Sequence, residues 1–494
     1  MQVTENVAVA SSAVTLRAPE DFELPDLAGL GGDLLVRPLE ERPITTVLWD
    51  TADLRLARWD CSLSHRDGEG WTVDLPGEPG GDGARRIHRF AGEGDAVPGG
   101  VLDLVAAFAR TAPLTPRHRL HSRRRAVGLL DTEGRLLVEV DEHVHDGDGA
   151  FELEVAAVLG GPGGLLPAVV DRLEDAGAIR LDAGATLVGA LGDAGPPEII
   201  VDDAGRHSTA AAVIRRAIAA STVRLIRHDA AVRLGADPEG VHQARVATRR
   251  LRSDLRTFRS LVVPQWGEAL REELRWFGGV LGEVRDADVL IAGLLTRVGR
   301  LPDDDRIAGD GVVEELRGRL LRSRERLLDQ MRSKRYLRLL ESLVDASHSP
   351  ALLPEAERPA REVLPGLVAR PWSRLRRDAR RLRRHGAHDE ELHALRIRAK
   401  RTRYAAEAGV PVLGRRAARF ARAVADLQDV LGEHHDAVVA AAWLRDHAGQ
   451  GVPAIEAFAA GQLWGIENDA AAQARSRWAR AWKQARRPKL RRWM

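Results

Sequence analysis

Five basic residues recur at helical spacing within the segment VHQARVATRRLRSDLRTF, from Val241 to Phe258. Successive members are three, four, three and four residues apart, and they are His242, Arg245, Arg249, Arg252 and Arg256. This spacing stacks side chains along one face of an α-helix, over about 20 Å of its axis. The opposite face is apolar and consists of Ala244, Ala247, Leu251, Leu255 and Phe258. We therefore expect a helix that buries one face and presents a narrow file of cations to a long anion.

A second segment repeats this pattern, with every position displaced by 151 residues. Its basic residues are His393, Arg396, Lys400 and Arg403, and LHALRIRAKRTR corresponds to VHQARVATRRLR. Another motif follows in the same order: LGEVRDADV begins at Leu281, and LGEHHDAVV begins at Leu431, displaced by 150 residues. Two motifs repeated at nearly one offset predict two similar helical units, packed as bundles about a pseudo-twofold axis.

Several features of the repeat have more than one interpretation. Asp286 and Asp436 occupy equivalent positions, and we expect them to pair with arginines or to cap a turn. His434 and His435 suggest a metal site, but adjacent helical positions point about 100° apart, so one cannot easily chelate with the other. Tyr404 is expected to pack between the bundles. A solvated helix face is the structural alternative for each cationic file, and the duplication argues against it.

The charge of the chain is unevenly divided. The 494 residues carry a net charge of +2, but residues 1–200 contain 18 arginines, no lysine and 34 acidic residues, a balance of −16. The remaining residues contain 56 basic and 38 acidic residues, a balance of +18. Such asymmetry indicates two modules with different partners, and the basic module is expected to attract a polyanion.

The composition disfavours several classes of protein. The sequence has no run of eighteen apolar residues, and its start has no basic segment followed by an apolar one. We therefore expect neither a membrane span nor a secretory signal, and a cytoplasmic location without a membrane partner. Cys61 is the only cysteine, which excludes an internal disulfide and a thiolate-rich metal site.

A candidate linker separates the two modules. The segment from Leu181 to His207 is rich in Gly, Ala, Pro and Asp, and the charge balance changes sign across it. We place the boundary near residue 204, so that the expected domains are residues 1–204 and residues 205–494. After the boundary the composition turns to Ala, Leu, Arg and Glu, which predicts helices to the C-terminus.

The first module has the pattern of short strands separated by turns. Four segments are rich in Val, Leu, Thr and aromatic residues, namely Thr45–Trp49, Trp71–Leu75, Leu136–Val140 and Phe151–Val155. Clusters such as DGEG and DGDG lie between them and suit hairpin turns. Helical stretches are expected at Val101–Arg110 and Leu166–Ala176. We predict an antiparallel sheet or barrel with peripheral helices, and hence a multidomain α+β chain.

Charged residues alternate along the expected strands. In RHRLHSRRR the alternating residues are Arg117, Arg119, His121 and Arg123, and in VEVDEHVH and FELEV they are Glu139, Asp141, Glu152 and Glu154. Alternate residues of a strand point to one face of the sheet. Opposed rows of cations and carboxylates inside a barrel would make a site for metal and phosphate, and a solvated sheet face is the other interpretation.

The stretch TTVLWDTADLRLARWDCSLSHRDGEGWTVDLPG resembles a strand and hairpin of the CYTH family, also called triphosphate tunnel metalloenzymes. RHRLHSRRR, LLVEVDEHVH and FELEV follow in a suitable order, so the resemblance covers most of residues 14–200. The family forms a closed antiparallel barrel whose tunnel binds a triphosphate and a divalent metal, and certain members hydrolyse the triphosphate. The resemblance therefore implies such a barrel in the first module.

This chain departs from the CYTH pattern at charged positions. Ser11, Ala13 and Thr15 stand at the signature Glu-x-Glu-x-Lys, and LSHR at 63–66 replaces the Leu-Arg-x-Arg hairpin motif. Cleavage of a phosphoanhydride needs carboxylates for Mg²⁺ or Mn²⁺ and a cation against the developing charge. We expect a degenerate barrel, and a triphosphate or polyphosphate hydrolase using Mg²⁺ or Mn²⁺ is the alternative function. The residual tunnel anion site would consist of Arg66, Arg117, Arg119 and Arg123.

The second module resembles the CHAD family, the conserved histidine α-helical domain, over residues 208 to about 488. Its motifs are VHQARVATRRLR, LGEVRDADVL, LHALRIRAKRTRYAAE and LQDVLGEHHDAV. Members form two four-helix bundles around a basic channel and bind inorganic polyphosphate without a cofactor, and the resemblance implies the same here, with recruitment to polyphosphate granules. It assigns binding to His242, Arg245, Arg249, Arg252, Arg256, His393, Arg396, Lys400 and Arg403.

The chemistry of the two files agrees with this ligand. Polyphosphate carries about one negative charge per phosphate, and arginine holds phosphate oxygens through short, charge-assisted hydrogen bonds. Histidines with the ordinary pKa of about 6.5 would add donors on protonation, so binding should weaken with salt and with rising pH. Nucleic acid is the rival partner, but the files contain no interleaved aromatic residues on which bases could stack, which disfavours it.

Overall fold

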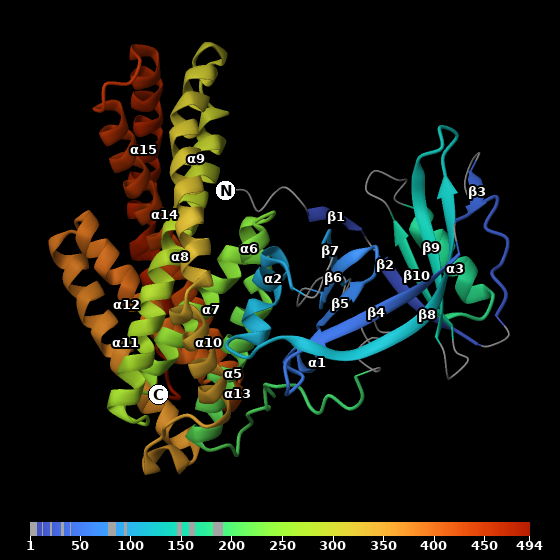
Figure 1. The fold of residues 1–494 in the computed structure, drawn as a ribbon. Coiled ribbons are helices and arrows are strands. Elements are labelled where there is room, and N and C mark those ends of the chain that lie inside the picture. The colour runs from blue at the N-terminus through green and yellow to red at the C-terminus, as the bar shows by residue number, and fades with distance from the viewer. Residues whose placement is uncertain are drawn as a thin grey trace. The chain divides into compact units, whose positions relative to one another are not determined.

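The computed structural model describes residues 7–11, 13–19, 22–30, 34–39, 41–77, 85–92, 96–145, 151–157, 164–180 and 191–494. The chain divides into two compact units, Met1–Glu198 and Ile199–Met494. The first consists mainly of strands, and the second contains thirteen helical segments, two of them short 3-10 helices (Figure 1). The expected α+β organisation is therefore present, and each unit is described by itself.

The first unit is built on one antiparallel sheet. Its strands are β1 (Val7–Ser11), β2 (Ala13–Ala18), β3 (Leu35–Pro38), β4 (Arg42–Asp50), β5 (Ser62–Arg66), β6 (Gly70–Leu75), β7 (Arg86–Phe90), β8 (Thr115–Leu130), β9 (Leu136–His145), β10 (Phe151–Ala157) and β11 (Ile179–Arg180). Three helices accompany it, α1 (Arg55–Arg58), α2 (Gly99–Ala109) and α3 (Leu165–Asp175). The predicted strands and helices of this unit are thus confirmed, with bounds that differ by a few residues.

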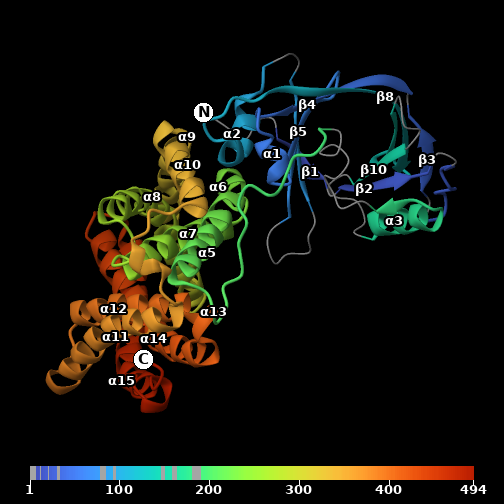
Figure 2. The same cartoon turned by 90° about the horizontal axis from the view of Figure 1, so that it is seen from below.

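The described strands form a curled sheet that does not close. Their order is β1-β7-β6-β5-β4-β8-β9-β10-β2-β11, with β3 beside β8, so β1 and β11 lie at opposite ends of this order. Figure 2 shows how the sheet curls from β4 and β8 round to β10 and β2. The N-terminal segment contributes to both ends, since β1 pairs with β7 whereas β2 pairs with β10 and β11. The closed barrel expected from the sequence is therefore corrected, for the described strands, to an open half-barrel.

The helix α3 covers part of this sheet. Its apolar side chains Val169, Val170 and Leu173 are buried against residues of β2, β8, β9 and β10, including Leu153. The strands β2, β9 and β10 present alternate residues to this core, as a strand periodicity of two requires, and β8 contributes Leu129. The charged side chains discussed below belong to other positions of the same strands.

The second unit is entirely helical. Its α-helices are α5 (Ala210–Arg227), α6 (Asp229–Leu234), α7 (Pro238–Thr257), α8 (Pro264–Val298), α9 (Asp303–Arg332), α10 (Lys334–His348), α11 (Ala360–His385), α12 (Asp389–Ala408), α13 (Val410–Leu413), α14 (Arg415–Ala448) and α15 (Ala454–Ala485). The 3-10 segments are η1 (Pro354–Glu357) and η2 (Pro488–Leu490). Among the described residues, no helix has the length and apolarity that a bilayer span requires.

The long helices pack in corresponding pairs. Helix α8 packs along α9 and α7, and α14 packs along α15 and α12 (Figure 1). The two cation-bearing helices α7 and α12 also contact each other directly. One core joins α11, α12, α14 and α15 around Trp372, Phe420 and Trp482, and another joins α8, α9, α14 and α15 around Leu294 and Leu463. Helix α12 belongs to the first core, and the direct contact between α7 and α12 places the two files of cations side by side.

Candidate functional site

Helix α7 holds the first file of cations. Asp237 caps its first turn by accepting a hydrogen bond from the Glu239 N–H at 2.7 Å, and Pro238 supplies a favourable first helical residue. The expected apolar face is confirmed, because Ala244, Ala247, Leu251, Leu255 and Phe258 are all buried. The cationic face is left beside α12 and α8.

The centre of the site lies where α7 meets α12. Lys400 of α12 is half-buried close to Arg396 of its own helix and to Arg245 and Arg249 of α7. Burial and the three guanidinium groups lower the pKa of the Lys400 ammonium to about 8, and Asp436 opposes them. The structure therefore brings together cations from both files. A charge that the protein itself disfavours is one that an anion would stabilise.

In each repeat, the LGE motif that follows the file in the sequence supplies an aspartate that pairs with one arginine of the file. Arg245 contacts Asp286 at 3.0 Å, and Arg396 contacts Asp436 at 3.7 Å, which confirms the expected pairing of these aspartates with arginines. A side chain at Gly282 would collide with the Arg245 guanidinium. The glycine and the aspartate of the motif thus admit and hold one arginine of the neighbouring helix.

The corresponding contacts extend to the outer helices. Glu283 of α8 contacts Arg326 of α9 at 2.8 Å, and Glu433 of α14 contacts Arg477 of α15. Arg326 and Arg477 are separated by 151 residues, the same offset as the two cationic files. The sequence motif is therefore repeated as a set of equivalent contacts.

Burial and neighbouring cations lower the pKa values of the histidines of the site, which favours their neutral forms. Burial and Arg285 lower the pKa of His242, and burial, Arg396 and Lys400 lower that of His393. His393 and His435 approach with 3.0 Å between their Nδ1 atoms, so one ring donates a proton and the other accepts it. Burial and these neighbours lower the pKa of His435 to about 4. The adjacent His434 instead lies 3.0 Å from Asp389.

Beyond Arg249, the file on α7 continues among arginines of α8. Burial, Arg275 and Arg271 lower the pKa of Arg252, and burial and Arg271 lower the pKa of Arg256. Arg252 and Arg256 therefore lie in a region of like charge, although Glu268 pairs with Arg271 and partly offsets it.

Arg403 is placed differently from the rest of its file. It hydrogen-bonds Glu407 one helical turn later at 2.6 Å, and Arg250 contacts the same carboxylate. Although burial disfavours the charge, Glu407 raises the pKa of the Arg403 guanidinium. Tyr404 is buried, and its ring lies 5.8 Å from the Arg249 guanidinium carbon. These residues line a cavity of about 460 Å³ that α5 also borders.

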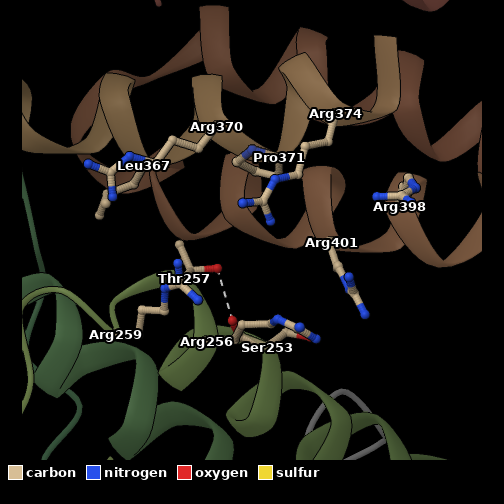
Figure 3. Close-up of a pocket in the computed structure, with 10 residues that line it drawn as sticks. All are labelled: Ser253, Arg256, Thr257, Arg259, Leu367, Arg370, Pro371, Arg374, Arg398 and Arg401. Carbon is tan, nitrogen blue, oxygen red and sulfur yellow. Dashed lines mark hydrogen bonds between the residues drawn. The ribbon is translucent and has the colours of Figure 1, made fainter. Parts of the chain in front are cut away.

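A second cavity, of about 110 Å³, lies at the C-terminal end of α7. We call it the arginine pocket, after the arginines that line it: Arg256, Arg259, Arg370, Arg374, Arg398 and Arg401. Side chains from α11 and α12 approach those from the end of α7 across it (Figure 3). Of these six, sequence reasoning identified only Arg256. The spacing of Arg370 and Arg374, one turn apart, was an available signal.

The charged residues of the first unit have a different arrangement. Arg124 of β8 meets three carboxylates, at 3.1 Å from Glu69, 2.6 Å from Glu139 and 2.6 Å from Asp141. Although burial disfavours its charge, these carboxylates raise the pKa of Arg124. The sequence analysis did not identify Arg124. It lies one position from the alternating row that was expected to face the interior.

Among the described residues, Arg66 alone of the four predicted members of the tunnel anion site shares a carboxylate with Arg124, namely Glu69. Arg117, Arg119 and Arg123 are exposed on β8, and Arg66 is half-buried with a guanidinium nitrogen 3.7 Å from Glu69. The side chains of Glu152 and Glu154 lie outside the described residues. Within the described part of the chain, no group of three or more His, Cys, Asp or Glu residues is placed to hold a metal ion.

A known protein family matches the part of the chain that contains the repeated motifs. The CHAD domain family matches residues 216–445, from within α5 to within α14. Uncharacterized protein MT2285 and Uncharacterized protein Rv2226, from two strains of Mycobacterium tuberculosis, are each 30% identical to this chain over 471 residues. Each alignment covers 89% of this chain and 87% of the relative.

Two solved structures are also similar. PptA from Streptomyces chartreusis is 23% identical, with a TM-score of 0.47, and the match covers 56% of this chain and 100% of that one. The CHAD domain from the plant Ricinus communis is 26% identical, with a TM-score of 0.44, and the match covers 56% of this chain and 95% of that one.

Proposed function

This chain belongs to the family of CHAD-domain proteins, and from that premise we propose that its helical unit binds inorganic polyphosphate along the facing helices α7 and α12. The ligand lies against the two files of cations, with Lys400, Arg245, Arg249 and Arg396 at the centre. Recruitment to polyphosphate granules follows as the proposed role.

One observation carries the proposal: cations from both files converge without enough carboxylates to neutralise them. Lys400 has a pKa of about 8 because it is buried among three guanidinium groups. Asp286 and Asp436 each engage one arginine, and Arg249 makes no ion pair with a carboxylate that the structure describes. A densely charged, flexible anion relieves this repulsion along the whole file.

We include in the proposal a basic channel between two pseudo-repeated four-helix bundles. Its support is the recurrence of the arginine, glutamate and aspartate contacts at offsets of 150 and 151 residues. A narrow channel suits a single flexible chain better than a duplex. Tyr404 is buried under arginines rather than presented for base stacking, which favours polyphosphate over nucleic acid.

The CYTH-like character of the first unit is a separate part of the proposal. It is supported by the curled antiparallel sheet and by the motifs in the sequence. We do not extend the proposal to hydrolysis, because Arg124 already engages Glu69, Glu139 and Asp141. Carboxylates held by an arginine are poorly disposed to take Mg²⁺ or Mn²⁺.

The proposal is tested by isothermal titration of the whole protein with long-chain polyphosphate at moderate salt. Removal of one charge-assisted contact costs about 1.5–3 kcal/mol, so Arg249→Ala and Lys400→Ala are each expected to weaken binding by about tenfold or more. The matched control is Lys483→Ala, an exposed lysine of α15, which should bind as the parent does.

Two outcomes contradict the proposal. Absence of binding by the parent protein would remove polyphosphate as the ligand, and parent-like affinity in both variants would remove α7 and α12 as the site. A competition experiment addresses the rival partner, since polyphosphate should displace RNA or DNA from any preformed complex. Persistence of that complex in excess polyphosphate would favour nucleic acid.

A further inference from the structure

The cationic file of α7 leads into the arginine pocket. Arg256 is the last member of the file and also lines the pocket, and Arg401 follows Lys400 directly on α12. Helix α7 ends at Thr257, and Leu367 and Pro371 of α11 form an apolar part of the wall. A chain that follows the file therefore reaches a confined place at which the line of cations stops.

The pocket holds an excess of positive charge. Arg398 is held by Asp378, but the other five arginines make no ion pair with a carboxylate that the structure describes. Burial, Arg256 and Arg374 are among the causes that lower the pKa of Arg401, and burial, Arg259 and Arg374 are among those that lower the pKa of Arg256. The guanidinium groups thus repel one another across the cavity (Figure 3).

The size of the pocket limits what can neutralise this charge. A volume of about 10–15 Å³ admits one water molecule, so the 110 Å³ of the pocket admits a group of several heavy atoms. One or two phosphate groups fit this description, whereas a coiled length of chain does not. The planar forks of arginine are suited to holding such a group by pairs of oxygens.

The two kinds of phosphate in a polyphosphate differ in charge. An interior phosphate carries one negative charge, whereas a terminal phosphate has a second ionisation near pH 6 and approaches a charge of −2 at neutral pH. The terminal group also has an additional free oxygen. A pocket with converging arginines therefore distinguishes a chain end from the interior of the chain.

We propose that the arginine pocket binds the terminal phosphate of a polyphosphate, so that the chain is anchored by its end and lies along α7 from there. The inference rests on the proposed function and adds to it a distinct site with its own selectivity. Under this proposal the protein recognises the ends of polyphosphate chains as well as their charge density. Pyrophosphate, in which both phosphates are terminal, is the simplest probe of the site.

The test uses the whole protein and isothermal titration with pyrophosphate. The parent should bind it, and Arg374→Ala should weaken binding by about tenfold, as expected for one charge-assisted contact. Arg401→Ala gives a second variant from another helix. Arg384→Ala is the matched control on α11, because Arg384 is exposed and does not line the pocket. Circular dichroism of each variant verifies that the helices remain folded.

A comparison of chain ends tests the anchoring itself. Long-chain polyphosphate with free ends should bind the parent about tenfold more tightly than the same chains with both ends capped as alkyl phosphoramidates. Arg374→Ala should remove this preference, whereas Arg249→Ala should weaken both forms and keep it. Equal binding of free and capped chains by the parent would overturn the inference while leaving the proposed function intact.

The remaining outcomes distinguish the proposed binding of polyphosphate from the anchoring of its chain end in the arginine pocket. If the parent binds pyrophosphate through Arg374 but fails to bind long chains, the proposed function and the anchoring of chain ends are overturned, and the pocket serves free short phosphates. If pyrophosphate does not bind and does not compete with long chains, the pocket is not a phosphate site.

Discussion

The cation cluster between α7 and α12 and the charge cluster around Arg124 use the same kinds of residues with opposite balance. Around Lys400 three guanidinium groups face one ammonium, with Asp436 as an opposing charge. Around Arg124 three carboxylates lie within 3.1 Å of one guanidinium, and Arg42 and Arg66 also contact one of them, Glu69. The first cluster lowers the pKa of its central cation, whereas the second raises it, although both central groups are partly buried.

This difference separates the proposed ligand site from an internal brace. A cluster whose charges are already matched gains little from a further ion, because its groups have the partners that an ion would supply. A cluster of one sign destabilises the folded protein until an opposite charge arrives. The comparison teaches that basic residues alone do not mark a binding site. Their lack of carboxylate partners does.

The largest effect is expected from a substitution that breaks the Arg124 cluster of the first unit. Arg124→Met removes one partner each from Asp141, Glu139 and Glu69, and Asp141 is buried. Removal of one partner from a buried ion pair costs about 3 kcal/mol or more, so native-state hydrogen exchange of β8 and β9 should become about a hundredfold faster.

The neighbouring residue supplies the control for this change. Arg123 lies on the same strand, but its side chain is 66% exposed and its contact with Glu41 is 3.7 Å long. Arg123→Met should alter stability by no more than about 0.5 kcal/mol. If both variants exchange alike, the Arg124 cluster is not a structural brace. Partial recovery in the double variant Arg124→Met with Asp141→Asn would sharpen the assignment.

The same kind of substitution should have the opposite effect in the second unit. Lys400→Met removes a cation that the folded protein holds among cations, so the protein without ligand should become more stable. A pKa of about 8 in place of the usual 10.5 corresponds to a gain of about 3 kcal/mol at most. With allowance for screening by solvent, we expect about 1–2 kcal/mol at pH 7 in urea unfolding.

The pH dependence of this gain has a defined sign. Below pH 8 Lys400 is charged in both the folded and the unfolded states, so the folded protein bears the whole cost. Between pH 8 and 10.5 the unfolded state binds more protons, and the stability of the parent rises towards that of Lys400→Met. Lys483→Met is the exposed control. If Lys400→Met unfolds at a lower urea concentration than the parent at pH 7, the conclusion that the charge of Lys400 destabilises the folded protein is wrong.

Much of the second unit could be predicted because its signals are local and repeated. The helical period placed Arg245 and Lys400 on their helices, and the duplication paired α7 with α12. The sequence could not predict which further helix supplies side chains around each file of cations. Arg374 comes from α11, which carries neither repeated motif, and its place in the arginine pocket depends on tertiary packing. Glu407, one turn after Arg403, was a local signal that this arginine is paired.

The first unit shows a different limit of sequence reasoning. Alternation along β8 correctly separates two sets of residues, but a period of two does not tell which set faces the carboxylates. The expected row included Arg123, and the ion pairs form at Arg124. Local sequence signals also could not predict whether the sheet closes. Closure depends on which strands β1 and β2 pair with, and they pair with β7 and β10, respectively.

A further prediction concerns which residue makes the proposed binding of polyphosphate depend on pH. The sequence suggested histidines, but burial and neighbouring charges lower the pKa values of His242, His393 and His435, which favours the neutral rings. Lys400 takes over this role at higher pH, since it loses its proton near pH 8 in the free protein. A bound polyanion raises that pKa, so binding above pH 8 takes up a proton.

Affinity for polyphosphate should therefore fall by about tenfold for each pH unit above 8, until the pKa of Lys400 in the complex is reached. Lys400→Arg is the matched variant, because a guanidinium stays charged throughout this range. Its affinity should be nearly constant from pH 8 to 9.5 in titrations at fixed ionic strength. An equally steep fall in Lys400→Arg would assign the proton to another group and would detach Lys400 from the centre of the binding site.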